Sequence, residues 1–158
     1  MKNSIWHHRT QAGEQCLQQD QPGMALIHYL AAMEQARYWV KNLNDELDSK
    51  KCIEAVSLFL RSCLNLVRYW YIQSDPNEQQ RYLLEATNYQ TYLGDLSQTA
   101  KDELQDTLYS YYKSLCKVIE HHPELDQIEK LRCQADLLQS DLKIITQSDA
   151  ATGSFNNA

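Results

Sequence analysis

Residues 23–47 read GMALIHYLAAMEQARYWVKNLNDEL, and this stretch decides the fold class. Its apolar side chains recur at alternating intervals of three and four residues. The recurring positions are Leu26, Tyr29, Met33, Ala36, Val40, Leu43 and Leu47. Because an α-helix completes a turn every ~3.6 residues, this spacing places them all on one face of a helix. We therefore predict an amphipathic helix that buries this stripe against the rest of the chain.

Five further segments are also predicted to be helical, most of them with a similar stripe. They are residues 4–19, 50–73, 76–94, 98–121 and 124–147. Turn and capping residues separate the segments, such as Asp75-Pro76 before the fourth helix and His121-His122-Pro123 before the sixth. Short connections make successive helices antiparallel. The sequence predicts an all-α fold, in which antiparallel pairs stack as an α-α superhelix or pack as a compact six-helix bundle.

Length and composition favour one domain. The chain has 158 residues, of which 43% are apolar and 23% charged, a balance typical of a globular protein with a sizeable core. Only 4 glycines and 3 prolines are present, which favours long helices over the many turns of an all-β fold. We predict a single helical domain over residues 1–147. Residues 148–158, SDAATGSFNNA, are small and polar, and we predict a disordered tail there.

Charge and cysteine usage narrow the class of partner and the compartment. The net charge is −6 and the chain has no dense cluster of Lys and Arg, so we expect neither nucleic acid nor an anionic membrane as partner. No apolar run approaches the roughly 20 residues that span a bilayer, and residues 1–9 lack the apolar region of a signal peptide. The 5 cysteines are odd in number and form no CxxC motif, which favours a reducing cytoplasm.

The first predicted helix pair carries a spacing of small and aromatic residues. Gly13 in the first helix is followed by Ala25, Tyr29 and Ala32 in the second. In this register the chain resembles a tetratricopeptide repeat, whose paired helices set a small residue against Ala, an aromatic residue and Ala. Small residues let two helices approach closely, and the aromatic ring fills the remaining space.

The resemblance strictly covers about residues 4–38, one repeat of a possible three. The family's usual Trp and Leu positions in its first helix fall on Arg9 and Ala12. The later pairs keep the helix–turn–helix rhythm without the signature. The resemblance implies a scaffold or chaperone that holds a peptide or partner helix in a concave groove. A bacterial secretion-type chaperone and a regulatory adaptor both suit a chain of this size.

Tyrosine and tryptophan are unusually frequent and occur in clusters beside basic residues. The chain has 10 Tyr and 3 Trp against 2 Phe, and the triplet Arg-Tyr-Trp occurs at residues 37–39 and again at 68–70. Consecutive helical residues point about 100° apart, so a cluster cannot lie wholly on one core face. Packing between helices explains most single rings, but Tyr, Trp and Arg also dominate binding hot spots. The predicted partner-binding residues are Arg37, Tyr38, Trp39, Arg68, Tyr69, Trp70, Tyr109, Tyr112 and Lys113.

The sequence lacks the common catalytic and metal-binding motifs. It contains no HExxH, no Gly-rich phosphate loop and no GxSxG elbow, and adjacent histidines on a helix diverge. We therefore predict a non-catalytic protein that binds another protein or a peptide, without metal or cofactor. The alternative is a helical-bundle enzyme or small-ligand binder with a buried pocket containing Cys and His. A third possibility is a homodimer that uses the aromatic face for self-association.

Overall fold

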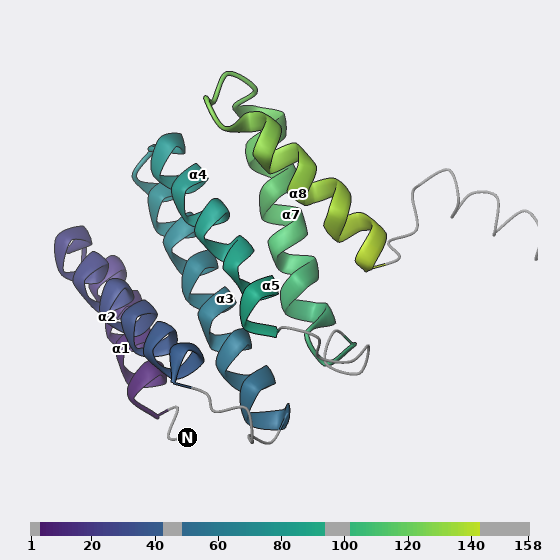
Figure 1. Cartoon of the computed structure of the whole chain (residues 1–158). Helices are drawn as coiled ribbons and strands as arrows, with labels where there is room; N and C mark the ends of the chain where they lie inside the picture. The colour runs from purple at the N-terminus through teal and green to yellow at the C-terminus, as the bar shows by residue number, and fades with distance from the viewer. Residues whose placement is uncertain (1–3, 43–48, 94–101, 143–158) are drawn as a thin grey trace, which may run out of the picture.

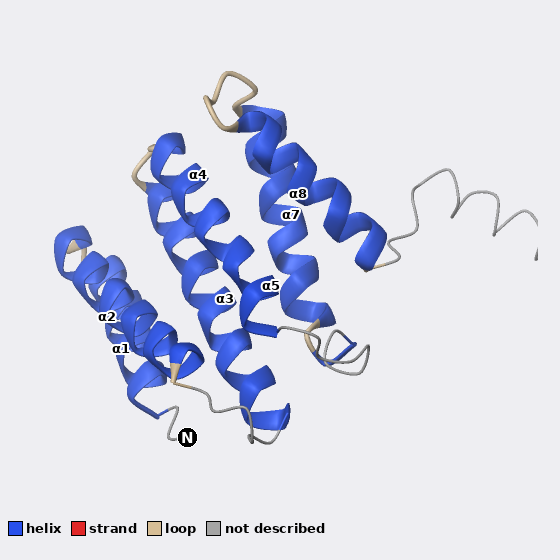
Figure 2. Ribbon diagram, in the orientation of Figure 1, coloured by secondary structure: helices blue, strands red, loops and turns tan. Residues whose placement is uncertain are grey.

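A computed structural model describes residues 4–42, 49–93 and 102–142 of the chain. Every regular element in these ranges is a helix, and no strand occurs in them (Figure 2). The prediction of an all-α fold is confirmed. Within the same ranges, no helix combines the length and the apolar character that crossing a membrane requires.

Three antiparallel helix pairs stand side by side in chain order (Figure 1). The pairs are α1 (Ser4–Gln18) with α2 (Pro22–Lys41), α3 (Ser49–Ile72) with α4 (Pro76–Glu85), and α7 (Gln105–His121) with α8 (Ile128–Asp141). A short 3-10 helix η1 (Ala86–Asn88) and helix α5 (Tyr89–Leu93) follow α4. Each pair also packs on the next, through α2 against α3 and through α3 and α4 against α7. One hydrophobic core therefore runs through all three pairs.

Helix starts agree with the proline and capping signals of the sequence. Pro22 is the first residue of α2, and Pro76 is the first residue of α4. Proline is tolerated there because the first backbone N–H of a helix has no partner within it. The Asp75 carboxylate accepts a hydrogen bond from the Glu78 backbone N–H at 3.1 Å and so caps α4. Several predicted helix ends and the predicted tail lie outside the described residues, within 43–48, 94–101 and 143–158.

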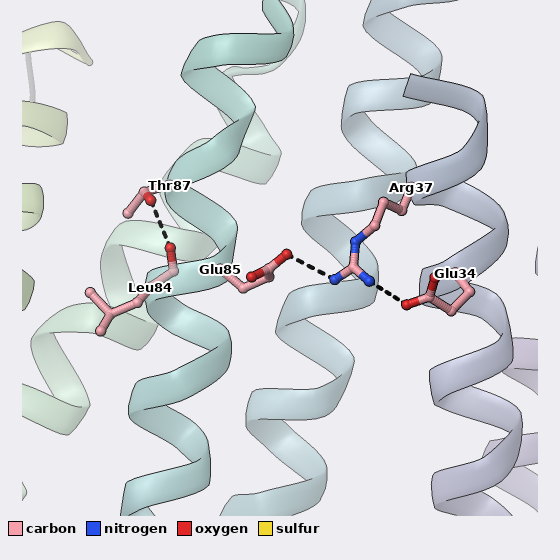
Figure 3. Close-up of polar contacts among 5 residues, drawn as sticks. All are labelled: Glu34, Arg37, Leu84, Glu85 and Thr87. Carbon is pink, nitrogen blue, oxygen red and sulfur yellow. Dashed lines mark hydrogen bonds and ion pairs between the residues drawn. The ribbon is translucent and has the colours of Figure 1, made fainter. Parts of the chain in front are cut away.

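The predicted helix over residues 76–94 is not continuous, because η1 separates α4 from α5. The hydroxyl group of Thr87 donates a hydrogen bond to the carbonyl oxygen of Leu84 at 2.6 Å (Figure 3). A hydroxyl bonded to a backbone carbonyl one turn back competes with the regular helical pattern. This local competition accounts for the tighter turn at η1.

The last helix begins at Ile128 and not at residue 124 as predicted. Gln80 of α4, which is buried, accounts for the difference. Its side-chain amide donates to an Asp126 carboxylate oxygen at 2.6 Å and accepts from the Gln127 backbone N–H at 3.0 Å. The segment before α8 is therefore held against α4 by side-chain contacts that the hydrophobic spacing does not report. Helix α7 begins at Gln105, after a turn at Leu104, and the predicted helix start at residue 98 lies outside the described residues.

The two helices of the first pair pack closely together, as their small residues predicted. Gly13, Ala25, Tyr29 and Ala32 are all buried. A Cβ atom added to Gly13 would lie only 3.0 Å from Cε1 of the Tyr29 ring. Such a distance is shorter than ordinary van der Waals contact, so glycine is what allows α1 to approach the ring this closely. The predicted close approach of the two helices is confirmed.

Helix α1 contacts α3 through Trp6. Ile5 is 54% exposed, whereas the adjacent Trp6 is only 1% exposed. The Trp6 indole N–H donates to the hydroxyl oxygen of Ser62 at 2.7 Å. The Arg61 guanidinium lies 4.8 Å from the centroid of the same ring. Trp6 is therefore an anchor between the first and second helix pairs.

Candidate partner-binding groove

A partly open groove of about 630 Å³ lies between α3 and α7. Four residues of α3 line it, with the spacing of a single helix face: Leu64, Val67, Arg68 and Tyr71. Four residues of α7 repeat the same spacing on the opposite wall: Ser114, Lys117, Val118 and His121. Residues at i, i+3, i+4 and i+7 lie on one side of a helix, so two complete stripes line the groove from its two walls.

Contacts behind the groove fix the position of α7 relative to the second pair. Tyr111 is fully buried, and its hydroxyl donates to the carbonyl oxygen of Leu83 on α4 at 2.6 Å. Its ring meets the ring of Tyr89 edge to face, with the centroids 6.3 Å apart. Burial raises the pKa of the Tyr111 hydroxyl above its ordinary value, so the group stays protonated and remains a donor. These contacts hold α7 against α4 and α5 of the second pair.

The groove has an apolar floor and a polar rim. Val67 and Val118 are buried, and the amide of Gln79 on α4, also buried, donates to the carbonyl oxygen of Val67 at 3.3 Å. Toward solvent, Arg68 is exposed and Tyr71 is 70% exposed. A partner that fills this groove therefore meets apolar side chains at its base and charged or aromatic side chains at its edge.

Positive charge gathers along this rim, although the whole chain has a net charge of −6. Arg68 and Lys117 face the groove from opposite walls, and His121 and His122 lie at the end of α7. None of the described residues that line it is acidic. The nearest ion pairs join Arg68 to Glu14 at 3.9 Å, and His122 to Glu124 at 3.4 Å if the imidazole is protonated.

Of the predicted partner-binding residues in the second triplet, the structure brings only Arg68 to the groove. Tyr69 is 4% exposed, and its hydroxyl donates to the carbonyl oxygen of Pro22 at 3.0 Å. Trp70 is half-buried and packs edge to face on Tyr69, with the ring centroids 4.9 Å apart. The prediction that Tyr69 offers a binding surface is therefore corrected, because its ring and hydroxyl connect α3 to the first pair.

Arg37, in the first triplet, forms its contacts with other residues of the fold. It forms ion pairs with Glu34 on its own helix and, at 2.8 Å, with Glu85 on α4 (Figure 3). Burial opposes the charge, but the two carboxylates raise the pKa of the guanidinium above its ordinary value. Tyr38 is 62% exposed, and Trp39 is half-buried against the core. None of these residues lines the groove between α3 and α7.

The predicted residues of α7 also lie away from the groove lining. Tyr109 is 46% exposed, and the Lys113 ammonium lies 4.8 Å from the centroid of its ring. Tyr112 is half-buried against the core. In the described part of the chain, Tyr71 is the single tyrosine that lines the groove. The groove lining is therefore apolar and cationic, whereas the sequence had predicted a groove rich in aromatic residues.

Sequence reasoning missed Tyr71, Lys117, His121 and His122 as groove residues. A signal was present, because the α7 stripe repeats the spacing of the α3 stripe at an offset of 50 residues. The predictions instead followed clusters of adjacent aromatic residues. Adjacent residues on a helix point in different directions, whereas a groove is lined by residues three and four apart.

The cysteines and histidines do not form a buried pair in the described residues. Cys63 is fully buried, but all histidines are exposed or half-buried. Burial raises the pKa of the Cys63 thiol, and the nearby Glu85 carboxylate adds to the shift. A thiol held protonated is a poor nucleophile. The same ranges contain no group of three or more His, Cys, Asp or Glu residues placed to hold a metal ion.

Iodoacetamide is expected to alkylate two of the cysteines at very different rates. Cys133 is exposed and Cys63 is fully buried, so Cys63 should react more than about a hundredfold more slowly in the folded protein. Mass spectrometry of peptides after timed quenching measures both rates, and unfolding in denaturant should make them similar. Equal rates in the folded protein would mean that Cys63 is accessible and reactive, as the pocket of an enzyme would require.

Comparison with known proteins identifies a family without assigning an activity. No curated protein and no solved structure shows significant similarity to the chain. A family model matches residues 4–149, which include all three helix pairs. The chain belongs to the family described as "Protein of unknown function (DUF2753)".

Proposed function

We propose that this protein is a non-catalytic interaction module that holds a segment of another protein in the groove between α3 and α7. The observation that carries the proposal is the pair of matching helix stripes that line this groove. An apolar centre inside a polar rim is the usual anatomy of a protein interface. A volume of about 630 Å³ accommodates a few partner side chains, because ligand clefts commonly measure roughly 300–1,000 Å³.

The stacked helix pairs also support the proposal, because they can act as a scaffold. The close packing of Gly13 against Tyr29 supports the resemblance to a tetratricopeptide repeat, and repeats of that kind stack to form extended concave binding surfaces. In this proposal the chain acts as a chaperone or a regulatory adaptor. All five cysteines are free, which suits the reducing cytoplasm.

Peptide selection tests the groove directly. A displayed library of random peptides is selected on the immobilised protein, and fluorescence anisotropy then measures the affinity of the selected peptides for two variants. Ser114→Trp places a large ring in the groove, whereas Ser140→Trp places the same ring on the exposed surface of α8. We expect Ser114→Trp to weaken binding at least about tenfold and Ser140→Trp to change it less than about twofold.

Circular dichroism must show that both variants keep their helical content. Peptides that bind the Ser114→Trp variant as tightly as the unmodified protein would place the binding surface elsewhere. A library that yields no binding peptide would also contradict the proposal.

A further inference from the structure

We infer that the segment held in this groove is acidic, with aspartate or glutamate side chains set between apolar ones. The inference rests on the proposed function and adds the chemistry of the partner. Its basis is the contrast between a chain of net charge −6 and a groove lining that contains Arg68, Lys117 and two histidines but, within the described residues, no carboxylate. Complementary charge selects partners and speeds their association.

The cations of the groove remain available to a partner. Arg68 meets Glu14 at 3.9 Å, and both side chains are well exposed, at 60% and 46%. Such exposed pairs are weak and exchange readily with solvent or with another carboxylate. Lys117 is exposed and forms no ion pair with any residue that the structure describes. Arg37 provides the contrast, because Glu34 and Glu85 already bind its guanidinium.

The arrangement of the lining sets the order of side chains expected in the partner. Arg68 and Lys117 approach from opposite walls, while Val67 and Val118 form the base between them. Carboxylates along the segment can therefore pair with the cations at the rim. Apolar side chains between them can cover the valines. The imidazoles of His121 and His122 line the same groove.

The test begins with peptides selected from a random displayed library on the unmodified protein. Groove-binding peptides are those whose binding is weakened by the Ser114→Trp substitution. We expect these peptides to be enriched in Asp and Glu. Replacing those residues by Asn and Gln should weaken binding about tenfold, and raised ionic strength should weaken it further. Amidation of the peptide's C-terminus should change binding less than about twofold, because the proposed contacts are made by side chains.

The protein side of the interaction is tested by reversing one charge. Lys117→Glu should weaken the binding of an acidic peptide about tenfold. A peptide with Lys in place of its acidic residues should recover affinity for that variant. Lys41→Glu is the matched control: it makes the same change of net charge at an exposed position of α2 that does not line the groove. It should change binding less than about twofold. Thermal unfolding by circular dichroism confirms that both variants fold.

The outcomes separate this inference from the proposed function. Groove-binding peptides that are neutral or basic would overturn the inference and leave the proposed function in place. Binding that is lost on C-terminal amidation alone, or equally with Lys117→Glu and Lys41→Glu, would also overturn it. Selected peptides that ignore Ser114→Trp, or a selection without binders, would overturn both.

Discussion

Replacing Trp6 by alanine is expected to lower the free energy of unfolding by about 3–5 kcal/mol, the usual effect of truncating a fully buried tryptophan. The Trp6 side chain is 1% exposed and lies between the first and second helix pairs. Its removal leaves a cavity there and also removes the indole hydrogen bond to Ser62. Urea unfolding followed by far-ultraviolet circular dichroism measures the change without relying on the fluorescence of the deleted ring.

Two control variants divide this effect into its parts. Ser62→Ala leaves the Trp6 indole N–H buried without its acceptor and should cost about 1–3 kcal/mol. Ile5→Ala removes a neighbouring apolar side chain that is 54% exposed, and should stay within about 0.5 kcal/mol of the unmodified protein. Equal stability of the Trp6→Ala and Ile5→Ala variants would show that Trp6 does not anchor α1 to the second pair.

Replacing Gly13 by leucine is expected to lower the free energy of unfolding by roughly 1–3 kcal/mol through overpacking. A Cβ atom at this position already lies 3.0 Å from Cε1 of Tyr29 and 3.1 Å from Cδ1 and Cζ. The further carbons of leucine have to displace either the buried ring or helix α1. Chemical denaturation measures the loss, and hydrogen exchange should show that it is greatest in α1 and α2.

Gly23 is the matched control, because a Cβ atom added there meets nothing within 4 Å. Gly23→Ala should leave stability unchanged or raise it by up to about 1 kcal/mol, since alanine favours the helix more than glycine does. A Gly13→Leu variant as stable as Gly23→Ala would mean that the register of the first pair is wrong.

The sequence identified only part of the candidate site. Arg68 was identified because it stands beside Tyr69 and Trp70 in the chain. Those two neighbours point toward the first pair and the core, so adjacency in sequence was a poor guide to a shared surface. Lys117 joins Arg68 only because α7 packs beside α3, a contact between residues far apart in the chain.

The amino-acid sequence by itself determined the helices, their antiparallel pairing and the close packing of Gly13 with Tyr29. These follow from local spacing, capping residues and short connections, which act between residues near one another in the chain. Only the tertiary structure decided that Trp6 is buried, that Gln80 delays the start of α8, and that Arg68 and Lys117 face one groove. The physical reason is that each of these depends on which helix faces which, and helix periodicity carries no information about that choice.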